Sequence, residues 1–337
     1  FSGDPRDLPS FPTRRSSDLV VACSCLTGAG TVEATLERFL GGAPFHEAVP
    51  GEIISSLLSS KEARRMKRLQ RLSMALAESV MKAPEAAPLA SIYFATGWGA
   101  LTETNDFLEK LYESNEQFTS PTDFVGSVHN APAGQLAIKY GATEKNITLT
   151  GGDHTFEQAL LAASLTLGIG EKGMIAGVDE YHDRLNPLFT GDTVPCDGGG
   201  ALVIAGEGTT GPFMELLFLR HCTENDSTAE ALASLLKQQP VPERYGAVFA
   251  GIPAYSGESA RNMLRRILAE AGISLPVVEY RAFTGEHASA TAVAAVLAAR
   301  CVAQGAAPAA GTPVPLDGKG ILIIGLGNDL SAISVTR

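Results

Sequence analysis

The chain has 337 residues, of which 45% are hydrophobic and 19% charged, so it can build a sizeable core and is too apolar for a disordered protein. Its net charge of −11 argues against nucleic acid as a partner, because binding phosphates needs a basic surface. Five cysteines in so long a chain do not make a disulfide framework, and no window approaches the roughly 18 apolar residues of a membrane span. We therefore expect a cytoplasmic globular protein with no membrane span.

The first 18 residues differ in character from the rest. The chain opens with Phe1, and the stretch DPRDLPSFPTRRSSDL shows no apolar period and carries a basic pair. It lacks the central apolar run of a signal peptide, and it resembles translated sequencing-adaptor read-through. We expect residues 1–18 to be a non-native leader, with a disordered native tail as the alternative.

From Leu19 onward, short apolar runs alternate with helical patterns. The runs predict strands at 19–26, 91–95, 146–150, 173–178, 200–205, 213–219, 247–251, 277–280, 321–326 and 330–335. Apolar residues spaced three and four apart predict helices at 31–40, 59–81, 155–167, 257–271 and 288–303. This alternation is typical of an α/β protein with a largely parallel sheet covered on both faces.

The pattern also repeats itself. A strand at 146–150 runs into Gly-Gly-Asp153-His154 and an apolar helix, and a strand at 277–280 runs into Thr-Gly-Glu286-His287 and an Ala-rich helix. A helix that is apolar on nearly every face must be buried all round. We therefore expect one duplicated α/β unit, with halves at 19–210 and 211–337 that meet around two central helices. The length alone, at about 150 residues per domain, would have suggested two independent domains.

Five segments, in this order, resemble the β-ketoacyl synthases, the condensing enzymes of the thiolase-like fold. They are VVACSCLTGAGTVEATLERFL (20–40), RRMKR (64–68), SPTDFVGSVHNAPAGQLAIKYG (120–141), DGGGA (197–201) and GLGN (325–328). The third is most similar to a divergent bacterial branch associated with aryl-polyene-type clusters and described as chain-length-factor-like. The resemblance implies a layered α-β-α-β-α architecture of two pseudo-symmetric halves, and a dimer.

The family's chemistry can be compared position by position. The resemblance implies a nucleophilic Cys at the start of the first buried helix, and counting from Asn146 this position falls on Asp153. It implies two His residues in the second half. The first position falls on Ile252, and the second is kept as His287 with one extra residue before it. Arg281 stands where the family has Lys, so one of the three central residues remains.

Asp153 admits three interpretations. As a helix N-cap, its carboxylate would accept backbone N–H bonds. As a general base it would work with His154 or His287 in a decarboxylase or hydrolase. A metal site formed with His154, Glu286 and His287 is the third, but no ligand spacing is diagnostic, so we predict neither a metal nor another cofactor.

Other residues have a structural and a functional interpretation each. The basic cluster Arg64, Arg65, Lys67, Arg68 and Arg71 is either a solvated helix face or a docking patch for an acidic carrier protein. His129 and Asn130 form either a structural turn or a substrate contact.

Two further motifs favour structural interpretations. Cys23 and Cys25 share one face of a strand, where they could bind a metal but are predicted to fill the core. The GLGN turn lacks the third glycine and following helix of a dinucleotide site.

The sequence therefore predicts a ketosynthase-like subunit without a nucleophile. Its partners would be an active ketosynthase, or a second copy of itself, and an acyl carrier protein, in fatty-acid-like or polyketide synthesis. One alternative is a self-sufficient acyltransferase or decarboxylase that acts through Asp153 and His287. The other is a non-catalytic scaffold that binds the carrier protein.

Overall fold

The computed structural model describes residues 18–337 except 65, 118–119, 192–193, 195, 207, 209, 223–226 and 309–312, and it leaves the side chains of Glu62 and Thr190 undescribed. The predicted leader lies outside the described residues apart from Asp18, which belongs to the first strand rather than to the leader. None of the described helices is long and apolar enough to cross a membrane.

Each predicted strand and helix has a counterpart in the structure, in the predicted order. The chain to residue 205 forms β1 (Asp18–Leu26), α1 (Val32–Leu40), α2 (Gly51–Leu57), α3 (Ser60–Ala63), α4 (Arg68–Val80), η1 (Pro84–Ala86), β2 (Ser91–Ala95), α5 (Leu101–Glu113), α6 (Pro121–Ser127), α7 (Ala131–Tyr140), β3 (Asn146–Leu149), η2 (Gly152–His154), α8 (Thr155–Thr166), β4 (Lys172–Asp179), α9 (Asn186–Thr190) and β5 (Gly198–Ala205). The remainder forms β6 (Phe213–His221), α10 (Thr228–Lys237), α11 (Val241–Arg244), β7 (Tyr245–Gly251), α12 (Gly257–Ala271), β8 (Val277–Glu279), α13 (Arg281–Thr284), α14 (Ala290–Gln304), β9 (Ala306–Ala307), β10 (Val314–Pro315), β11 (Gly320–Gly325) and β12 (Asp329–Thr336). The prediction missed several helices: α2, α5, α6, α7, α9, α10, α11 and α13.

The strand order shows the duplication directly. The main sheet runs β3-β2-β4-β5-β1 in the first half and continues β6-β12-β11-β7-β8 in the second. In each half the two outermost pairings are parallel and the two inner ones antiparallel. The prediction of a largely parallel sheet was therefore wrong, since β5 and β12 run against their neighbours. β12 follows β11 through residues 326–328 alone, which is too short for a parallel crossover. β5 follows β4 through the longer segment 180–197, which contains only the short helix α9. The boundary near residue 210 stays a proposal, which this correspondence supports.

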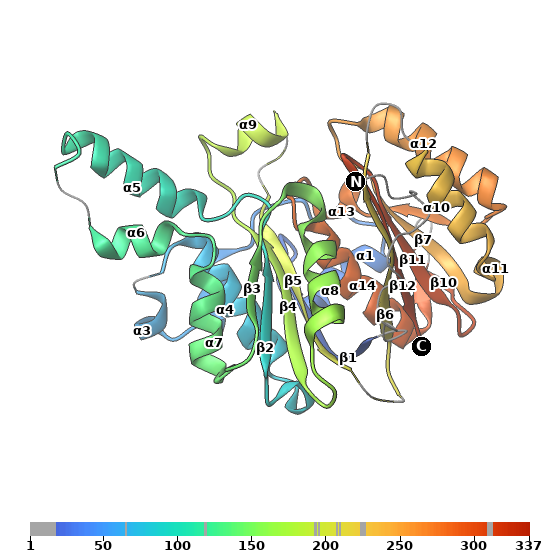
Figure 1. The fold of residues 1–337 in the computed structure, drawn as a ribbon, viewed down its shortest axis with the longest axis horizontal. Coiled ribbons are helices and arrows are strands. Elements are labelled where there is room, and N and C mark those ends of the chain that lie inside the picture. Colours follow the sequence, from blue (N-terminus) through green and yellow to red (C-terminus); the bar gives the residue numbers. More distant parts are fainter. Residues whose placement is uncertain are drawn as a thin grey trace, which may run out of the picture.

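Helices form three layers around the two halves of the sheet (Figure 1). α8 and α14 pack between the halves, α4 and α7 cover the outer face of the first half, and α10 and α12 cover that of the second. Strand residues alternate accordingly: in β2, Tyr93 faces the central core and Phe94 the outer one. This is the predicted α-β-α-β-α layering.

The buried helix α14 approaches the sheet closely because the facing strands carry glycine. A Cβ at Gly200 would lie 2.3 Å from the carbonyl oxygen of Ala292, and one at Gly177 would lie 2.7 Å from the Ala292 Cβ. Its Ala-rich sequence fits such a position, because small side chains let a helix pack on every face. The two strand cysteines fill the core as predicted: Cys25 is fully buried, and Cys23 packs against the same cluster.

The predicted helix at 59–81 is broken, because α3 ends at Ala63 and α4 begins at Arg68. Arg68 turns inward at this break. Its Nε lies 2.7 Å from Asp197 Oδ2, and its Nη2 donates to Asp197 Oδ1 at 2.9 Å and to the Val49 carbonyl at 2.8 Å. Asp197 is 2% exposed and also accepts the Val49 N–H at 2.8 Å. Two of the segments that carried the family resemblance are thus joined by an ion pair between the partly exposed Arg68 and the buried Asp197.

We expect Arg68→Ala to lower the free energy of unfolding by roughly 3 kcal/mol, because it leaves the buried Asp197 carboxylate without its cation. Arg64→Ala removes an exposed charge from the same segment and is the matched control, with an expected change within about 0.5 kcal/mol. Urea unfolding of both variants measures this. Equal stability of the two would show that the Asp197 contact contributes little.

Candidate functional site

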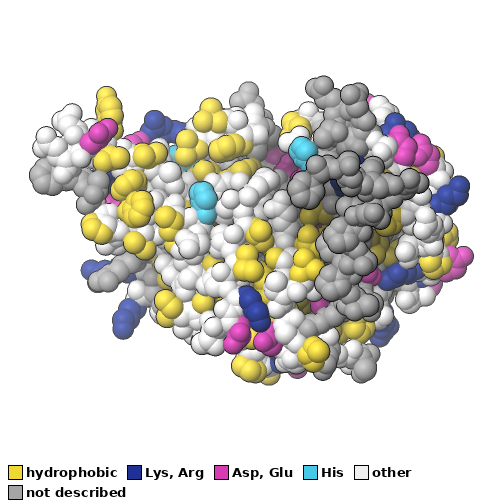
Figure 2. All heavy atoms as spheres, viewed as in Figure 1, with side chains coloured by type: hydrophobic (Ala, Val, Ile, Leu, Met, Phe, Trp, Pro, Cys, Tyr) yellow, Lys and Arg dark blue, Asp and Glu magenta, His cyan; other side chains and the backbone are white. Residues whose placement is uncertain are grey.

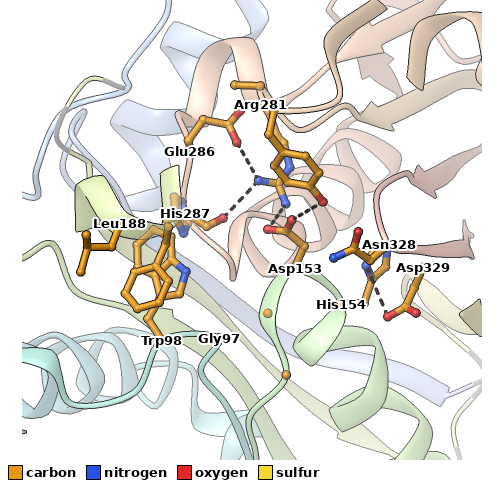
Figure 3. A pocket seen from close by; sticks show the side chains of 15 residues that line it. Gly97, Trp98, Asp153, His154, Leu188, Arg281, Glu286, His287, Asn328 and Asp329 are labelled. Carbon is orange, nitrogen blue, oxygen red and sulfur yellow. Dashed lines mark hydrogen bonds and ion pairs between the residues drawn. The ribbon is translucent and has the colours of Figure 1, made fainter. Parts of the chain in front are cut away.

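A cavity of about 400 Å³ opens where the starts of the two central helices meet. It is lined by residues 97–98 after β2, 151–154 before α8, 188–189 in α9, 254–255 after β7, Arg281, 286–287 before α14, and 328–329 between β11 and β12. Both halves of the chain contribute to the lining. The two acid–His pairs of the sequence repeat line the same cavity: Asp153 with His154, and Glu286 with His287 (Figure 3).

The buried carboxylate of Asp179, at the end of β4, fixes this arrangement. Its Oδ1 accepts bonds from Thr96 Oγ1 (2.9 Å) and from the N–H groups of Gly97 (2.9 Å) and Trp98 (3.0 Å). Its Oδ2 accepts the Ser289 N–H at 2.7 Å. One side chain therefore holds the turn after β2 against the start of α14. Burial raises its pKa to about 6, against the effect of these hydrogen bonds.

The Asp153 carboxylate is held by Arg281 and Tyr255 and not by the backbone of the helix that follows it. Its Oδ1 lies 3.0 Å from Arg281 Nη2, and its Oδ2 accepts the Tyr255 hydroxyl at 3.1 Å. The N-cap of α8 is His154, without a side-chain cap bond. The interpretation of Asp153 as a helix cap was wrong, because the 3₁₀ turn η2 intervenes before α8 and Arg281 attracts the carboxylate.

Arg281 is the central cation of the cavity. Its side chain is 5% exposed, and its Nη1 donates to Glu286 Oε2 at 3.2 Å and to the His287 carbonyl at 3.4 Å. Burial alone would lower the pKa of Arg281, but Asp153, Tyr280 and Glu286 together raise it well above its usual value. The guanidinium therefore stays charged and joins the acids of both halves.

His287 is fully enclosed. Its side-chain Nδ1 lies 3.3 Å from Ser289 Oγ, and burial together with the nearby Arg281 charge lowers its pKa to about 3. The imidazole is therefore neutral at physiological pH. The neutral ring can donate one hydrogen bond to a carbonyl oxygen, but it carries no positive charge.

His154 belongs to a second group of acids and histidines, on the far side of Asp153 (Figure 3). Its Nδ1 lies 3.9 Å from Asp329 Oδ2, while Asp329 Oδ1 is 2.6 Å from the exposed His221 Nδ1. Behind it, the buried Glu157 accepts the Ser331 hydroxyl at 3.0 Å, and burial raises the pKa of Glu157. His154 is 3% exposed, so its imidazole lies inside the protein and packs beside these acids.

Aromatic and aliphatic side chains form the rim. The rings of Trp98 and Phe189 are stacked at 6.1 Å with an interplanar angle of 13°. Leu188 is 77% and Tyr255 60% exposed beside the cavity. An apolar rim over a charged floor suits a ligand with a polar reacting end and an apolar body.

The structure brings together four of the predicted site residues and leaves others outside. Asp153, His154, Arg281 and His287 line the cavity. Neither histidine hydrogen-bonds to Asp153 among the described residues, so the predicted acid–His pairing is replaced by the Arg281 ion pair. His129 and Asn130 are exposed and do not line this cavity, and Asn130 is the N-cap of α7. Ile252 is buried in the outer core of the second half.

The predicted basic patch is reduced by the structure. Arg68 points inward to Asp197, so the prediction that it belongs to the docking patch was wrong. Arg65 lies outside the described residues. Arg64 and Arg71 are exposed, and Lys67 is 54% exposed with its Nζ 2.8 Å from Asp106 Oδ2. Among the described residues, Arg64, Lys67 and Arg71 stay a proposed docking surface.

Sequence reasoning missed Tyr255, Asp179, Trp98 and Asp329. Asp179 ends β4, Asp329 begins β12, and Trp98 and Tyr255 lie in loops that follow β2 and β7. Loops and strand ends are where binding groups are commonly carried. That position was the available signal, but it does not indicate which of many such residues turns toward the cavity.

A double α/β unit around two buried helices, with a cavity at the helix starts, is the thiolase-like architecture that the resemblance implied. The family model for the β-ketoacyl synthase N-terminal domain matches residues 46–182. No curated protein is significantly similar to the chain in sequence. This match confirms the predicted resemblance to the β-ketoacyl synthases.

Solved structures share the fold at low identity. The ishigamide ketosynthase/chain length factor is 18% identical with a TM-score of 0.73, over 95% of this chain and 99% of that chain. A type II PKS acyl-carrier protein in complex with its ketosynthase bound to the hexaketide (AntDE:AntF) is 17% identical with a TM-score of 0.73, over 96% and 99%. A β-ketoacyl synthase from Burkholderia phymatum STM815 is 12% identical with a TM-score of 0.72, over 96% and 100%.

The low pKa of His287 makes stability depend on pH. Its pKa in the folded protein lies below the unfolded value of 6.5, so the unfolded chain takes up the proton first. Above pH 6.5 the protonation of His287 costs no stability. Below pH 6.5 it lowers the free energy of unfolding by about 1.4 kcal/mol for each pH unit, down to about pH 3. We expect His287→Gln to flatten the loss of thermal stability between pH 6.5 and 4. Exposed His129→Gln, the control, should keep the wild-type slope.

Proposed function

We propose that the protein is a ketosynthase-like subunit without a nucleophile. It would pair with an active ketosynthase and shape the tunnel for the growing acyl chain, in fatty-acid-like or polyketide synthesis in the cytoplasm. The observation that carries this proposal is the ion pair between Asp153 and Arg281 at the start of α8. In this position the family has a thiolate, whereas here both carboxylate oxygens are engaged by donors.

The thiols of this chain support the same conclusion. None of the five cysteines lines the cavity. Burial raises the pKa of Cys23 to about 11 and the pKa values of Cys196 and Cys301 to about 12. A nucleophilic cysteine needs a lowered pKa at an accessible helix start or beside a cation. These thiols are protonated at neutral pH and buried or partly buried.

The alternative of a decarboxylase or acyltransferase acting through Asp153 and His287 has less support. A general base must have a free lone pair directed at the reacting proton. Asp153 already accepts from Arg281 and Tyr255, and His287 is 1% exposed. No observation favours the pure scaffold over the paired subunit.

The names of the structural neighbours add support for the partners. One is a ketosynthase/chain length factor, and another holds an acyl-carrier protein against its ketosynthase. By analogy, an active ketosynthase and an acidic carrier protein are the expected partners here. Arg64, Lys67 and Arg71 would steer the carrier protein, since opposite surface charges accelerate encounter.

The free edge of the first half offers the surface for a second subunit. β3 is the outermost strand, and an edge strand exposes unpaired backbone groups. Apolar side chains flank it on both faces: Leu165 (46% exposed) and Ile169 (77%) at the end of α8, and Ile138 (85%) on α7. Hydrophobic side chains gather across this face (Figure 2). A second thiolase-like chain would cover both the edge and the apolar residues.

Incubated with acyl- and malonyl-carrier proteins, the isolated protein should form no covalent adduct and no condensation product. In Asp153→Cys, by contrast, the new thiol should be alkylated by iodoacetamide much faster than any native cysteine, because the helix N-terminus and Arg281 lower its pKa. Intact-mass spectrometry measures both. An acyl adduct on the wild-type chain would contradict the proposal.

Charge placed at the β3 edge should abolish pairing. We expect Leu165→Lys to weaken the complex with a co-expressed ketosynthase at least tenfold, since burying an unpaired ammonium is costly. Val277→Lys on the opposite edge strand, β8, is the matched control, because Val277 is similarly exposed at 43%. Analytical ultracentrifugation separates the outcomes. Isolation of the wild-type chain as a stable homodimer that excludes the ketosynthase would favour self-pairing.

A further inference from the structure

A second hollow lies beside α6, away from the cavity described above. Its larger part, about 730 Å³, has apolar walls that include Pro121, Val125 and Ile138. Its smaller part, about 70 Å³, reaches Glu103 in α5. Gln70, Thr122 and Gly126 line both parts, so the two parts lie side by side. We call this the α6 groove.

The floor of the α6 groove carries acceptors that lack donors. Glu103 is 6% exposed, and neither of its carboxylate oxygens has a hydrogen-bond partner among the described residues. Gln135 donates to Gln70 Oε1 at 3.1 Å, but its own buried Oε1 has no partner among the same residues. Buried polar groups in proteins are almost always satisfied, so three unsatisfied oxygens in one groove need an explanation.

The nearby cations do not supply the missing charge. Lys67 Nζ is 2.8 Å from Asp106 Oδ2, and Lys110 Nζ is 2.6 Å from Asp123 Oδ2, so each lysine already has its own carboxylate. Burial, together with the nearby Glu180, raises the pKa of Glu103 to about 7. The groove thus contains one carboxyl group more than its cations neutralise.

We infer that the α6 groove receives an arginine side chain, carried on an apolar segment of the partner subunit. A guanidinium has five N–H donors and no acceptor, and it binds a carboxylate through two parallel bonds. Val125 and Ile138 are 62% and 85% exposed and would pack on the neighbouring apolar residues of that segment. Ile138 also belongs to the surface beside β3, so the groove continues the proposed interface. This inference rests on the proposed pairing.

A small probe tests the groove without any partner. Butylguanidinium carries the same head and an apolar tail, and butylurea is its neutral counterpart. At pH 8 we expect butylguanidinium to bind the wild-type protein saturably and Glu103→Gln at least tenfold more weakly, as measured by isothermal titration calorimetry. Butylurea should bind both alike. Equal binding of butylguanidinium to the two proteins would overturn the inference.

The folding of the variant can be checked from the same carboxyl group. The folded pKa of Glu103 lies above its unfolded value, so ionisation costs stability as pH rises from about 4.5 through 7. Glu103→Gln should therefore melt at the wild-type temperature at pH 4.5 and at a higher temperature at pH 8. A variant that melts lower at pH 8 would show that Glu103 is already partnered, against the inference.

A further experiment tests the groove with the partner itself, the ketosynthase recovered by co-expression. We expect Glu103→Gln to weaken that complex at least tenfold and Gln135→Leu to weaken it less, while Val277→Lys leaves it unchanged. An unaltered affinity in Glu103→Gln would overturn the role of the groove and leave the pairing intact. Failure of the wild-type chain to form any complex would instead overturn the pairing and, with it, the source of the arginine.

Discussion

The site depends on one buried carboxylate, Asp179. Four donors from two distant segments meet on it, and they bind the turn after β2 to the first turn of α14. Without this carboxylate the N–H groups of Gly97, Trp98 and Ser289 would each lose this acceptor. Buried donors without an acceptor cost about 1–3 kcal/mol apiece in proteins, so Asp179 stabilises the contact between the two halves beside the cavity.

Charge pairing determines what this closed cavity can do. Arg281 gathers Asp153 from the first half and Glu286 from the second, so the acids that the duplication places face to face are held by one cation. The Asp153 carboxylate before α8 accepts bonds from the Arg281 guanidinium and the Tyr255 hydroxyl. These contacts are the basis of the proposal that Asp153 has a structural rather than a reactive role.

Most of the fold was predictable from local pattern, and most of the side-chain roles were not. Strand and helix positions followed from periodicity, and the helix at 257–271 matches α12 (Gly257–Ala271) to the residue. Arg68 was placed among exposed docking charges because it lies in a basic run. Its partner is 129 residues away, at Asp197. Asp153 was interpreted as a cap for the same reason: local sequence shows the helix start but not the guanidinium, 128 residues on, that lies beside it.

The sequence by itself determined the alternation of strands and helices and the two buried central helices. It also predicts Asp153 at the position where the family resemblance implies a cysteine. These follow from hydrophobic period and from residue identity, which are local properties. Only the tertiary structure decided that β5 and β12 run antiparallel to their neighbours and that Arg281 binds Asp153. It also decided that Glu103 lies in the α6 groove without a hydrogen-bond partner among the described residues. Such outcomes depend on which distant groups burial brings within a few ångströms, and the energy of a buried charge is set by those neighbours.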